Sequence, residues 1–282
     1  MRRRVWSETV PYDELVRSEV VDLVTRHRLD LLLAVRPWQL AEVGDVVRRF
    51  RDRGVFVGLW PMLADDDGRW VNARSTPAFI PFADAVLDAA PEADELILDL
   101  EPAKAQLEKW KEWRPTWRQT PSPGRYAEAR EELVEATRRW HRDRRITTAV
   151  LPLLAFELRG EWVQRAVGTP ATALDVDRHS VMAYTSLIEG WSRGLIDRRR
   201  AETMLSVCAR LARVRFGARA ALSLGTVGVG AFEDEPSYRS PVELARDVAI
   251  AISAGIDELS LFDLGGMLRR PPAHAWLEAF GA

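Results

Sequence analysis

Residues 94–102 read DELILDLEP, and this stretch decides the fold prediction. Successive side chains of a β-strand point to opposite faces. One face of this segment is therefore entirely apolar, whereas the other begins apolar and ends acidic. The first face carries Leu96, Leu98 and Leu100, and the second carries Ile97, Asp99 and Glu101. A segment that is apolar on both faces and ends in two carboxylates indicates a buried strand leading to a functional site.

Short apolar runs alternate with amphipathic segments along the whole chain. The predicted strands cover residues 4–9, 30–37, 55–63, 94–102, 146–154, 179–186, 219–228 and 256–264. Strand–helix alternation indicates a parallel sheet, and eight such units in roughly 250 residues are typical of a closed barrel. We therefore predict an α/β fold, a (β/α)8 TIM barrel that forms a single domain over residues 1–282. The proline-rich segment around 114–125 is predicted to be an inserted loop, and a doubly wound open sheet is the alternative fold.

Composition excludes several classes of protein. The 40 basic and 42 acidic residues give a net charge of -2, which argues against a nucleic-acid partner. Cys208 is the only cysteine, so neither an intrachain disulfide nor a cysteine-based zinc site can form. No apolar stretch approaches the roughly 20 residues that span a bilayer, and the N-terminus lacks a signal-type apolar segment. We expect a soluble, cytoplasmic protein with no membrane partner, metal or cofactor, and the sequence does not indicate its oligomeric state.

Active sites of such barrels lie at the carboxyl ends of the strands. Those ends supply the predicted substrate-binding residues, which are Trp6, Glu8, Arg36, Trp38, Trp60, Thr185, Phe262 and Asp263. Flat, amphipathic aromatic rings at a rim suit stacking on sugar faces, and we favour Trp38 and Trp60 for that role. Trp70 and Trp191 lie in or near the following loops. Trp110, Trp113 and Trp117 flank the predicted insert and are interpreted as packing beneath it or as a lid.

Asp99 and Glu101 are the predicted catalytic carboxylates. They share one strand face, so their like charges and their burial should raise a pKa within the pair. A protonated Glu beside an ionised Asp suits general acid catalysis on a glycosidic oxygen. The alternative interpretation is a structural salt bridge at the strand end, with Arg36 as the partner.

The same residues resemble a known family. DELILDLE resembles the fourth-strand motif D-x-x-D-x-D-x-E of family 18 glycoside hydrolases, the chitinase-like enzymes, with Asp94, Asp99 and Glu101 on matching positions. VMAY (181–184) resembles the sixth-strand M-x-Y-D motif through Met182 and Tyr184, and ELSLFDLGG (258–266) resembles the eighth strand. The resemblance implies that Glu101 protonates the leaving group. It also implies that Asp99 and Tyr184 orient a substrate acetamido group that attacks the anomeric carbon.

The chain departs from that pattern at three positions. Ile97 stands where the motif has its middle Asp, Thr185 where the sixth strand has an Asp, and Phe262 where the eighth strand usually ends in Trp. An inverting mechanism is a second possibility, and it needs another carboxylate about 6.5–9.5 Å from the acid. Glu8 and Asp263 are the candidates for that role. A retaining mechanism with a nucleophilic Glu at the end of the seventh strand would need one of the acidic residues at 233–235, which are expected to lie too far along their loop.

The expected substrate is a small molecule or an oligosaccharide, and two other functions stay open. Glycine-rich GTVGVG (225–230) and LGG (264–266) follow the seventh and eighth strands, where barrels bind phosphate, which favours a phosphosugar isomerase or lyase. The incomplete motif also fits a non-catalytic sugar-binding barrel. Such a binder would not need an acid at Glu101.

Overall fold

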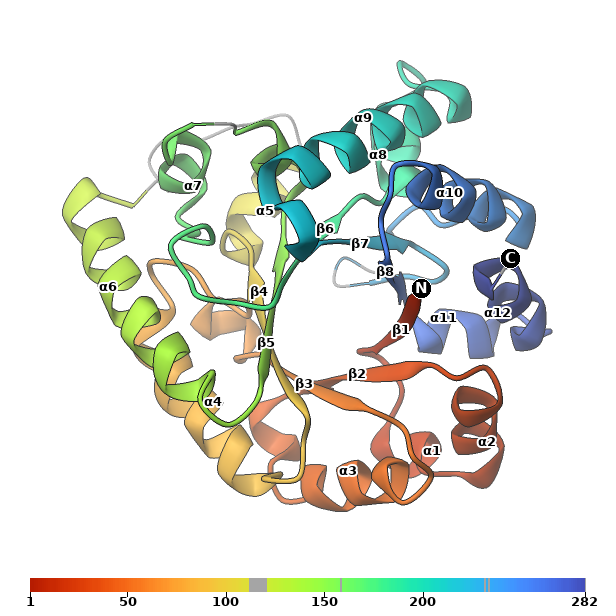
Figure 1. Cartoon of the computed structure of the whole chain (residues 1–282), viewed down its shortest axis with the longest axis horizontal. Coiled ribbons are helices and arrows are strands. Elements are labelled where there is room, and N and C mark those ends of the chain that lie inside the picture. Colours follow the sequence, from red (N-terminus) through yellow and green to blue (C-terminus); the bar gives the residue numbers. More distant parts are fainter. Residues whose placement is uncertain (112–120, 158, 231, 233, 282) are drawn as a thin grey trace.

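The computed structural model describes residues 1–111, 121–157, 159–230, 232 and 234–281. Eight parallel strands close into a barrel in chain order, because the first strand pairs with both the second and the eighth (Figure 1). The strands are β1 (Arg2–Ser7), β2 (Asp30–Val35), β3 (Val57–Pro61), β4 (Glu95–Leu100), β5 (Arg145–Val150), β6 (Arg178–Met182), β7 (Ala220–Gly225) and β8 (Glu258–Phe262). The predicted (β/α)8 barrel is confirmed, and the open-sheet alternative is wrong.

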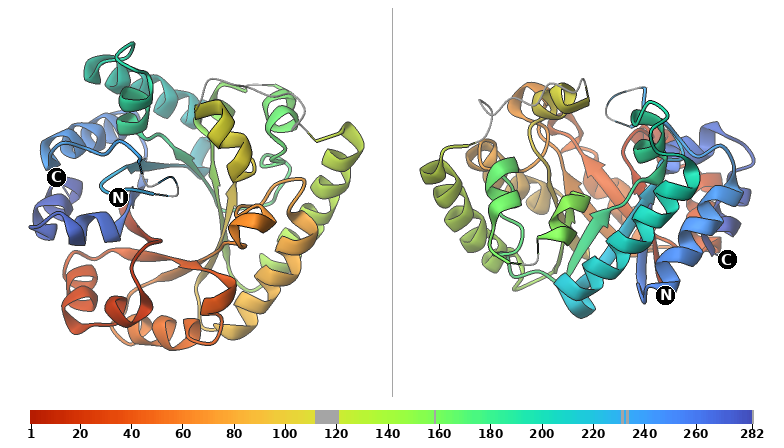
Figure 2. Two further views of the ribbon diagram at one scale, coloured as in Figure 1. Left: turned by 180° about the vertical axis from the view of Figure 1, so that it is seen from behind. Right: turned by 90° about the horizontal axis from the view of Figure 1, so that it is seen from above.

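Helices surround the barrel, as both views in Figure 2 show. The helices of the described residues are α1 (Tyr12–Leu15), α2 (Ser18–Arg26), α3 (Val43–Arg51), α4 (Thr76–Ala89), α5 (Lys104–Lys111), α6 (Pro123–Trp140), α7 (Trp162–Val167), α8 (Thr185–Trp191), α9 (Arg198–Phe216), α10 (Pro241–Ser253), α11 (Leu264–Arg269) and α12 (Ala273–Gly281). Within the described residues, none of these helices has the length and apolar character needed to cross a membrane.

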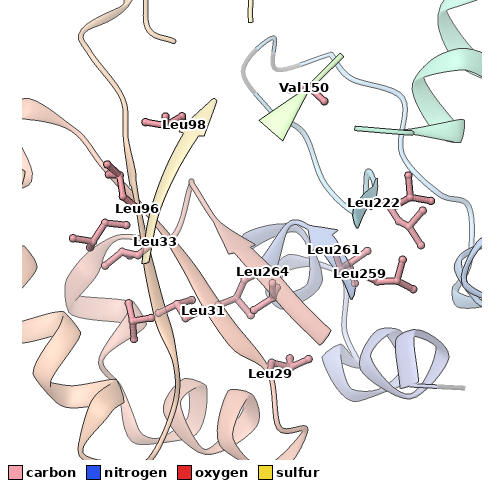
Figure 3. Packing of buried hydrophobic residues seen from close by; sticks show 14 of the residues in the cluster. Leu29, Leu31, Leu33, Leu96, Leu98, Val150, Leu222, Leu259, Leu261 and Leu264 are labelled. Carbon is pink, nitrogen blue, oxygen red and sulfur yellow. The ribbon is translucent and has the colours of Figure 1, made fainter. Parts of the chain in front are cut away.

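The alternation predicted for β4 determines which side chains fill which layer of the core. Outward-facing side chains pack between the strands and the helices, and Figure 3 shows leucines of β2, β4 and β8 in this layer. Leu96, Leu98 and Leu100 belong to it. Ile97 instead points into the barrel, where it packs in a separate interior cluster with Trp60 and Met182. The predicted division of the β4 side chains is confirmed.

A buried ion network fills the end of the barrel where the strands begin. The guanidinium of Arg4 is fully buried, pairs with Glu95, and donates to Glu258 over 3.0 Å. Arg145 completes the network, with its nitrogens 3.2 Å from Glu95 and 2.6 Å from Glu258. Glu95 thus meets two cations, and Glu258 meets a third in Arg178 at 3.6 Å, as a buried charge requires. This packed end leaves the opposite end, where the strands finish, as the place for a cavity.

Several element boundaries differ from the prediction. β5 ends at Val150 because Pro152 starts a 3₁₀ turn, and β6 ends at Met182 because α8 begins three residues later. The helix α6 already begins at Pro123, since Ser122 caps it by accepting from the Arg125 N–H, so the last residues of the predicted insert are helical. Trp113 and Trp117 lie outside the described residues, and so does the Trp110 side chain. The interpretation of these tryptophans as packing or a lid therefore stays a prediction.

Candidate active site

A cavity of about 490 Å³ lies where the strands end. Four carboxylates line it, and they come from three parts of the barrel. Asp99 and Glu101 belong to β4 and the residue after it, Glu8 follows β1, and Glu235 lies in the loop after β7. The cavity therefore gathers acidic groups that are far apart in sequence, and the β4 pair predicted from the sequence is among them.

Asp99 is buried under apolar neighbours. Its side chain follows Ile97 on the inner face of β4, so an aliphatic group lies where the motif of family 18 has a further carboxylate. The residue is 2% exposed, and its Oδ1 atom has no hydrogen-bond partner among the described residues. This burial, with the nearby charge of Glu8, raises the pKa of Asp99 to about 8.

Glu101 lies one residue beyond β4, at the wall of the cavity. Burial raises its pKa well above the usual value for Glu, and the charges of Asp99 and Glu235 raise it further. No ion pair joins Asp99 or Glu101 to another residue in the described ranges. Because two such carboxylates cannot both ionise easily at close range, the pair holds a proton at neutral pH.

Arg36 does not neutralise this pair. It donates to the Leu63 carbonyl over 2.8 Å and pairs with Asp65 over 2.6 Å. The structural salt bridge between Arg36 and the β4 carboxylates, the alternative considered from the sequence, is therefore absent from the described residues. The β4 pair therefore has no cationic partner among the described residues.

Arg69 is a residue that sequence reasoning missed. It is nearly buried, pairs with Glu8, and reaches Asp65 over 2.7 Å. Its φ angle is 60°, in the left-handed region that non-glycine residues adopt at a cost of about 1–2 kcal/mol. Burial raises the pKa of Glu8, and the Arg69 charge opposes that rise. A strained arginine beside the cavity thus supplies the counter-charge for one carboxylate of the four.

Glu235 lies in the cavity lining, contrary to the prediction from the sequence. The loop after β7 turns back, with the Tyr238 N–H donating to the Thr226 carbonyl over 2.8 Å. This return places Glu235 in the cavity wall, so the expectation that residues 233–235 lie too far along is wrong for Glu235. Burial, assisted by the charge of Glu8, raises the pKa of Glu235 to about 7. Glu233 lies outside the described residues.

Aromatic residues form much of the remaining lining. The aromatic lining residues are Trp6, Trp60, Trp70, Tyr184, Trp191, Phe232 and Phe262. The Trp6 and Trp60 rings meet edge to face, with centroids 4.8 Å apart. Ser223 on β7, also missed from the sequence, accepts from Trp6 Nε1 over 2.8 Å and lies 3.2 Å from the Tyr184 hydroxyl. Its inward position on β7 is the alternation signal that could have revealed it.

Four predicted substrate-binding residues do not line the cavity. Trp38 is 65% exposed, and its ring lies against the Arg36 guanidinium at 5.0 Å. Thr185 is buried at the start of α8, where its hydroxyl bonds to Asp247. Asp263 caps α11 by accepting from the Gly266 N–H over 2.9 Å. The positions of these three residues and of Arg36 give no support to a direct role in binding.

Asp247 holds two walls of the cavity together from outside the barrel. This buried carboxylate accepts from Thr185 at the start of α8 and from the Tyr238 hydroxyl over 2.7 Å, and it pairs with Arg198 of α9. Gly190 in α8 also packs so closely on Pro236 that a Cβ atom there would overlap the proline ring. The helix α8 and the loop after β7 are therefore fixed against each other.

The glycine-rich loops after β7 and β8 pack against each other. Gly228 and Gly266 lie in direct backbone contact, where a side chain on either would collide with the other. The N-terminus of α11 is capped by the Asp263 carboxylate, and the helix has only 6 residues. A carboxylate in this position repels a phosphate, so the geometry gives no support to the phosphate site considered from the sequence.

No protein-family model matches the sequence, and no curated protein matches it. Solved structures do share the fold. The PgaB (BpsB) glycoside hydrolase domain from Bordetella bronchiseptica has a TM-score of 0.58 at 10% identity, with 99% of each chain covered. A family GH18 chitinase catalytic domain from the fern Peteris ryukyuensis has a TM-score of 0.56 at 11% identity, covering 100% of this chain and 98% of that one. D-psicose 3-epimerase from Clostridium cellulolyticum H10 has a TM-score of 0.51 at 11% identity, covering 100% and 97%. The chain thus resembles family 18 barrels in its fold, as its motifs predicted.

Proposed function

We propose that the chain is a glycoside hydrolase in which Glu101 is the general acid. The observation that carries this proposal is the Asp99–Glu101 pair, which lies in the cavity where β4 ends without a cationic partner among the described residues. A general acid at neutral pH must hold its proton, and the burial and like charges that raise the pKa of Glu101 favour this. Glu101 therefore donates the proton to the glycosidic oxygen of the leaving group.

The neighbouring groups have complementary roles in this proposal. Asp99 raises the pKa of Glu101 and, once ionised, stabilises positive charge that develops on the sugar. Tyr184 keeps its proton, because burial raises the pKa of its hydroxyl well above the usual range. Its hydroxyl, held near Ser223, donates a hydrogen bond close to the reacting carbon. Trp6 and Trp60 offer ring faces and edges to a sugar. The family 18 chitinases and the sugar epimerases that share the fold support a carbohydrate substrate.

Hydrolysis of chromogenic glycosides, N-acetylglucosaminides included, tests the proposal with three proteins. These are the wild type, Glu101→Gln, and the matched control Glu92→Gln in the exposed turn before β4. We expect one sugar of the panel to be hydrolysed, and Glu101→Gln to lower kcat/KM by about 10²–10⁴-fold while Glu92→Gln leaves it unchanged. Unchanged turnover in Glu101→Gln would contradict the assignment. Sugar binding without turnover in the wild type would instead identify a sugar-binding barrel.

A further inference from the structure

One side of the cavity is built from aliphatic side chains. We define the aliphatic wall as Leu107 of α5, Leu151 after β5, Leu187 and Ile188 of α8, and Ile196 in the turn that follows α8. Trp191 extends this wall, and its ring meets that of Phe232 at 6.1 Å. These residues line the same continuous cavity as the four carboxylates. A bound molecule that extends from Glu101 across the cavity therefore also contacts aliphatic surface.

The aliphatic wall offers little to the hydroxyl groups of a second sugar. Ser192 is the one hydroxyl-bearing residue between α8 and Ile196 that lines the cavity in the described structure. Its Oγ is already bonded to the Glu189 carbonyl over 2.8 Å and to the Ile196 N–H over 2.9 Å. A sugar hydroxyl buried here without a partner would lose its hydrogen bonds to water at a cost of about 1–3 kcal/mol. The wall therefore favours an apolar group over a polyol.

The distribution of charged residues around the cavity restricts the charge that a substrate can carry. Glu8, Asp99, Glu101 and Glu235 all line the cavity, and of the described cations only Arg69 pairs with any of them. The aliphatic wall itself carries no charged side chain, so a charged group placed on it would lose its hydration without gaining a counter-charge. The molecule that fits is thus uncharged in the part that contacts the aliphatic wall.

We propose that the substrate is a glycoside with an uncharged apolar aglycone, an alkyl or aryl alcohol. This inference rests on the proposed function, since it places the sugar at the carboxylates and the aglycone on the aliphatic wall. Glu101 then donates its proton to the oxygen that joins the two parts. The C–O bond to the anomeric carbon breaks, and the apolar alcohol leaves with that proton. Water supplies the new hydroxyl of the sugar, and its remaining proton returns to the Glu101 carboxylate.

Binding of alkyl glycosides tests the proposal without turnover. The probes are methyl, butyl and hexyl β-D-glucopyranosides and N-acetyl-β-D-glucosaminides, titrated below micelle-forming concentrations into Glu101→Gln with tryptophan fluorescence as the readout. We expect the affinity to rise about twofold to fourfold for each added methylene group. In the same background, Ile196→Asn should abolish most of this rise, whereas Leu195→Asn should preserve it, because Leu195 is 67% exposed and lies outside the cavity lining. Leu187→Asn serves as a second wall variant if Ile196→Asn does not fold.

Three results would overturn the proposal, and the first two separate it from the proposed function. The first is an affinity that does not depend on chain length, and the second is a chain-length effect that survives both wall variants. Either result would place the aglycone away from the aliphatic wall without contradicting the proposed glycosidase function. Free 1-butanol and 1-hexanol are the matched probes without a sugar. Alkanols that bind as tightly as the glycosides would show that the sugar contributes nothing, which would contradict both the inference and the proposed function.

Discussion

The two ends of the barrel interior treat buried carboxylates in opposite ways. On β4, Glu95 lies at one end and Asp99 four residues later at the other. Arg4 and Arg145 both reach Glu95, whereas Asp99 lies above Ile97 and has no ion-pair partner in the described residues. Glu258 on β8 belongs to the same packed end as Glu95. Burial acts to raise the pKa of Glu258, yet the charges of Arg4 and Arg145 hold that pKa below its usual value. The pKa of Asp99, in contrast, rises to about 8. The strand β4 thus carries one carboxylate that is paired with cations and one that has no cationic partner among the described residues.

The largest expected effect on stability comes from removing a cation at the packed end of the barrel. Arg4→Met leaves Glu95 and Glu258 buried with one cation fewer, which should lower the free energy of unfolding by about 3–5 kcal/mol. Thermal unfolding measures the loss, with Arg49→Met on the exposed side of α3 as the control. The folded fraction should keep its kcat. A loss of kcat equal to that of Glu101→Gln would show that the packed end is not purely structural.

At the cavity end, neutralising a carboxylate should stabilise the protein. The folded-state pKa of Asp99, about 8, lies above the reference value of 3.8, so the ionised form destabilises the fold. This cost is absent below about pH 4 and complete above about pH 8. Asp99→Asn should therefore raise the free energy of unfolding by at least about 1 kcal/mol at pH 9, with a smaller gain at pH 5.

Melting temperatures at the two pH values measure that gain, which corresponds to about 2–4 °C per kcal/mol for a chain of this size. Asp88→Asn, an exposed change on α4, is the matched control. A lower melting temperature for Asp99→Asn at pH 9 would show that Asp99 has a stabilising partner, and the contrast between the two ends would fail.

The smallest expected effect is a shift in the pH profile of kcat/KM when Glu235, a second carboxylate of the cavity, loses its charge. The charge of Glu235 contributes to the raised pKa of Glu101, so Glu235→Gln should lower that pKa. Since the general acid must be protonated, kcat/KM falls as the pH rises through the pKa of Glu101. The alkaline limb of the pH profile should therefore move to lower pH. The control Glu131→Gln, on the exposed face of α6, should leave the alkaline limb in place. An unmoved limb in Glu235→Gln would show that the charge of Glu235 does not influence the pKa of Glu101.

The sequence predicts the parts of the site that obey strand periodicity. Asp99, Trp6 and Trp60 lie on inward positions of strands, so alternation and the barrel rule together place them at the cavity. Trp38 lies beyond Pro37 in a 3₁₀ turn, where that rule no longer applies, and its side chain is exposed. Arg69 and Glu235 enter the site through loop conformations that no periodic pattern encodes.

The contacts of Asp247 bear on how substrate selectivity and catalysis are divided between elements in the proposed function. The proposed acid and its partner lie on β4 and directly after it, whereas α8, which carries two residues of the aliphatic wall, is anchored through Thr185 to the Asp247 carboxylate behind it. The cavity-lining side chains Leu187 and Ile188 can therefore be exchanged without replacing the anchor Thr185 or the proton-bearing groups. In the proposed function, selectivity and chemistry thus belong to separate elements, and an engineer could retune the first at two positions of one short helix.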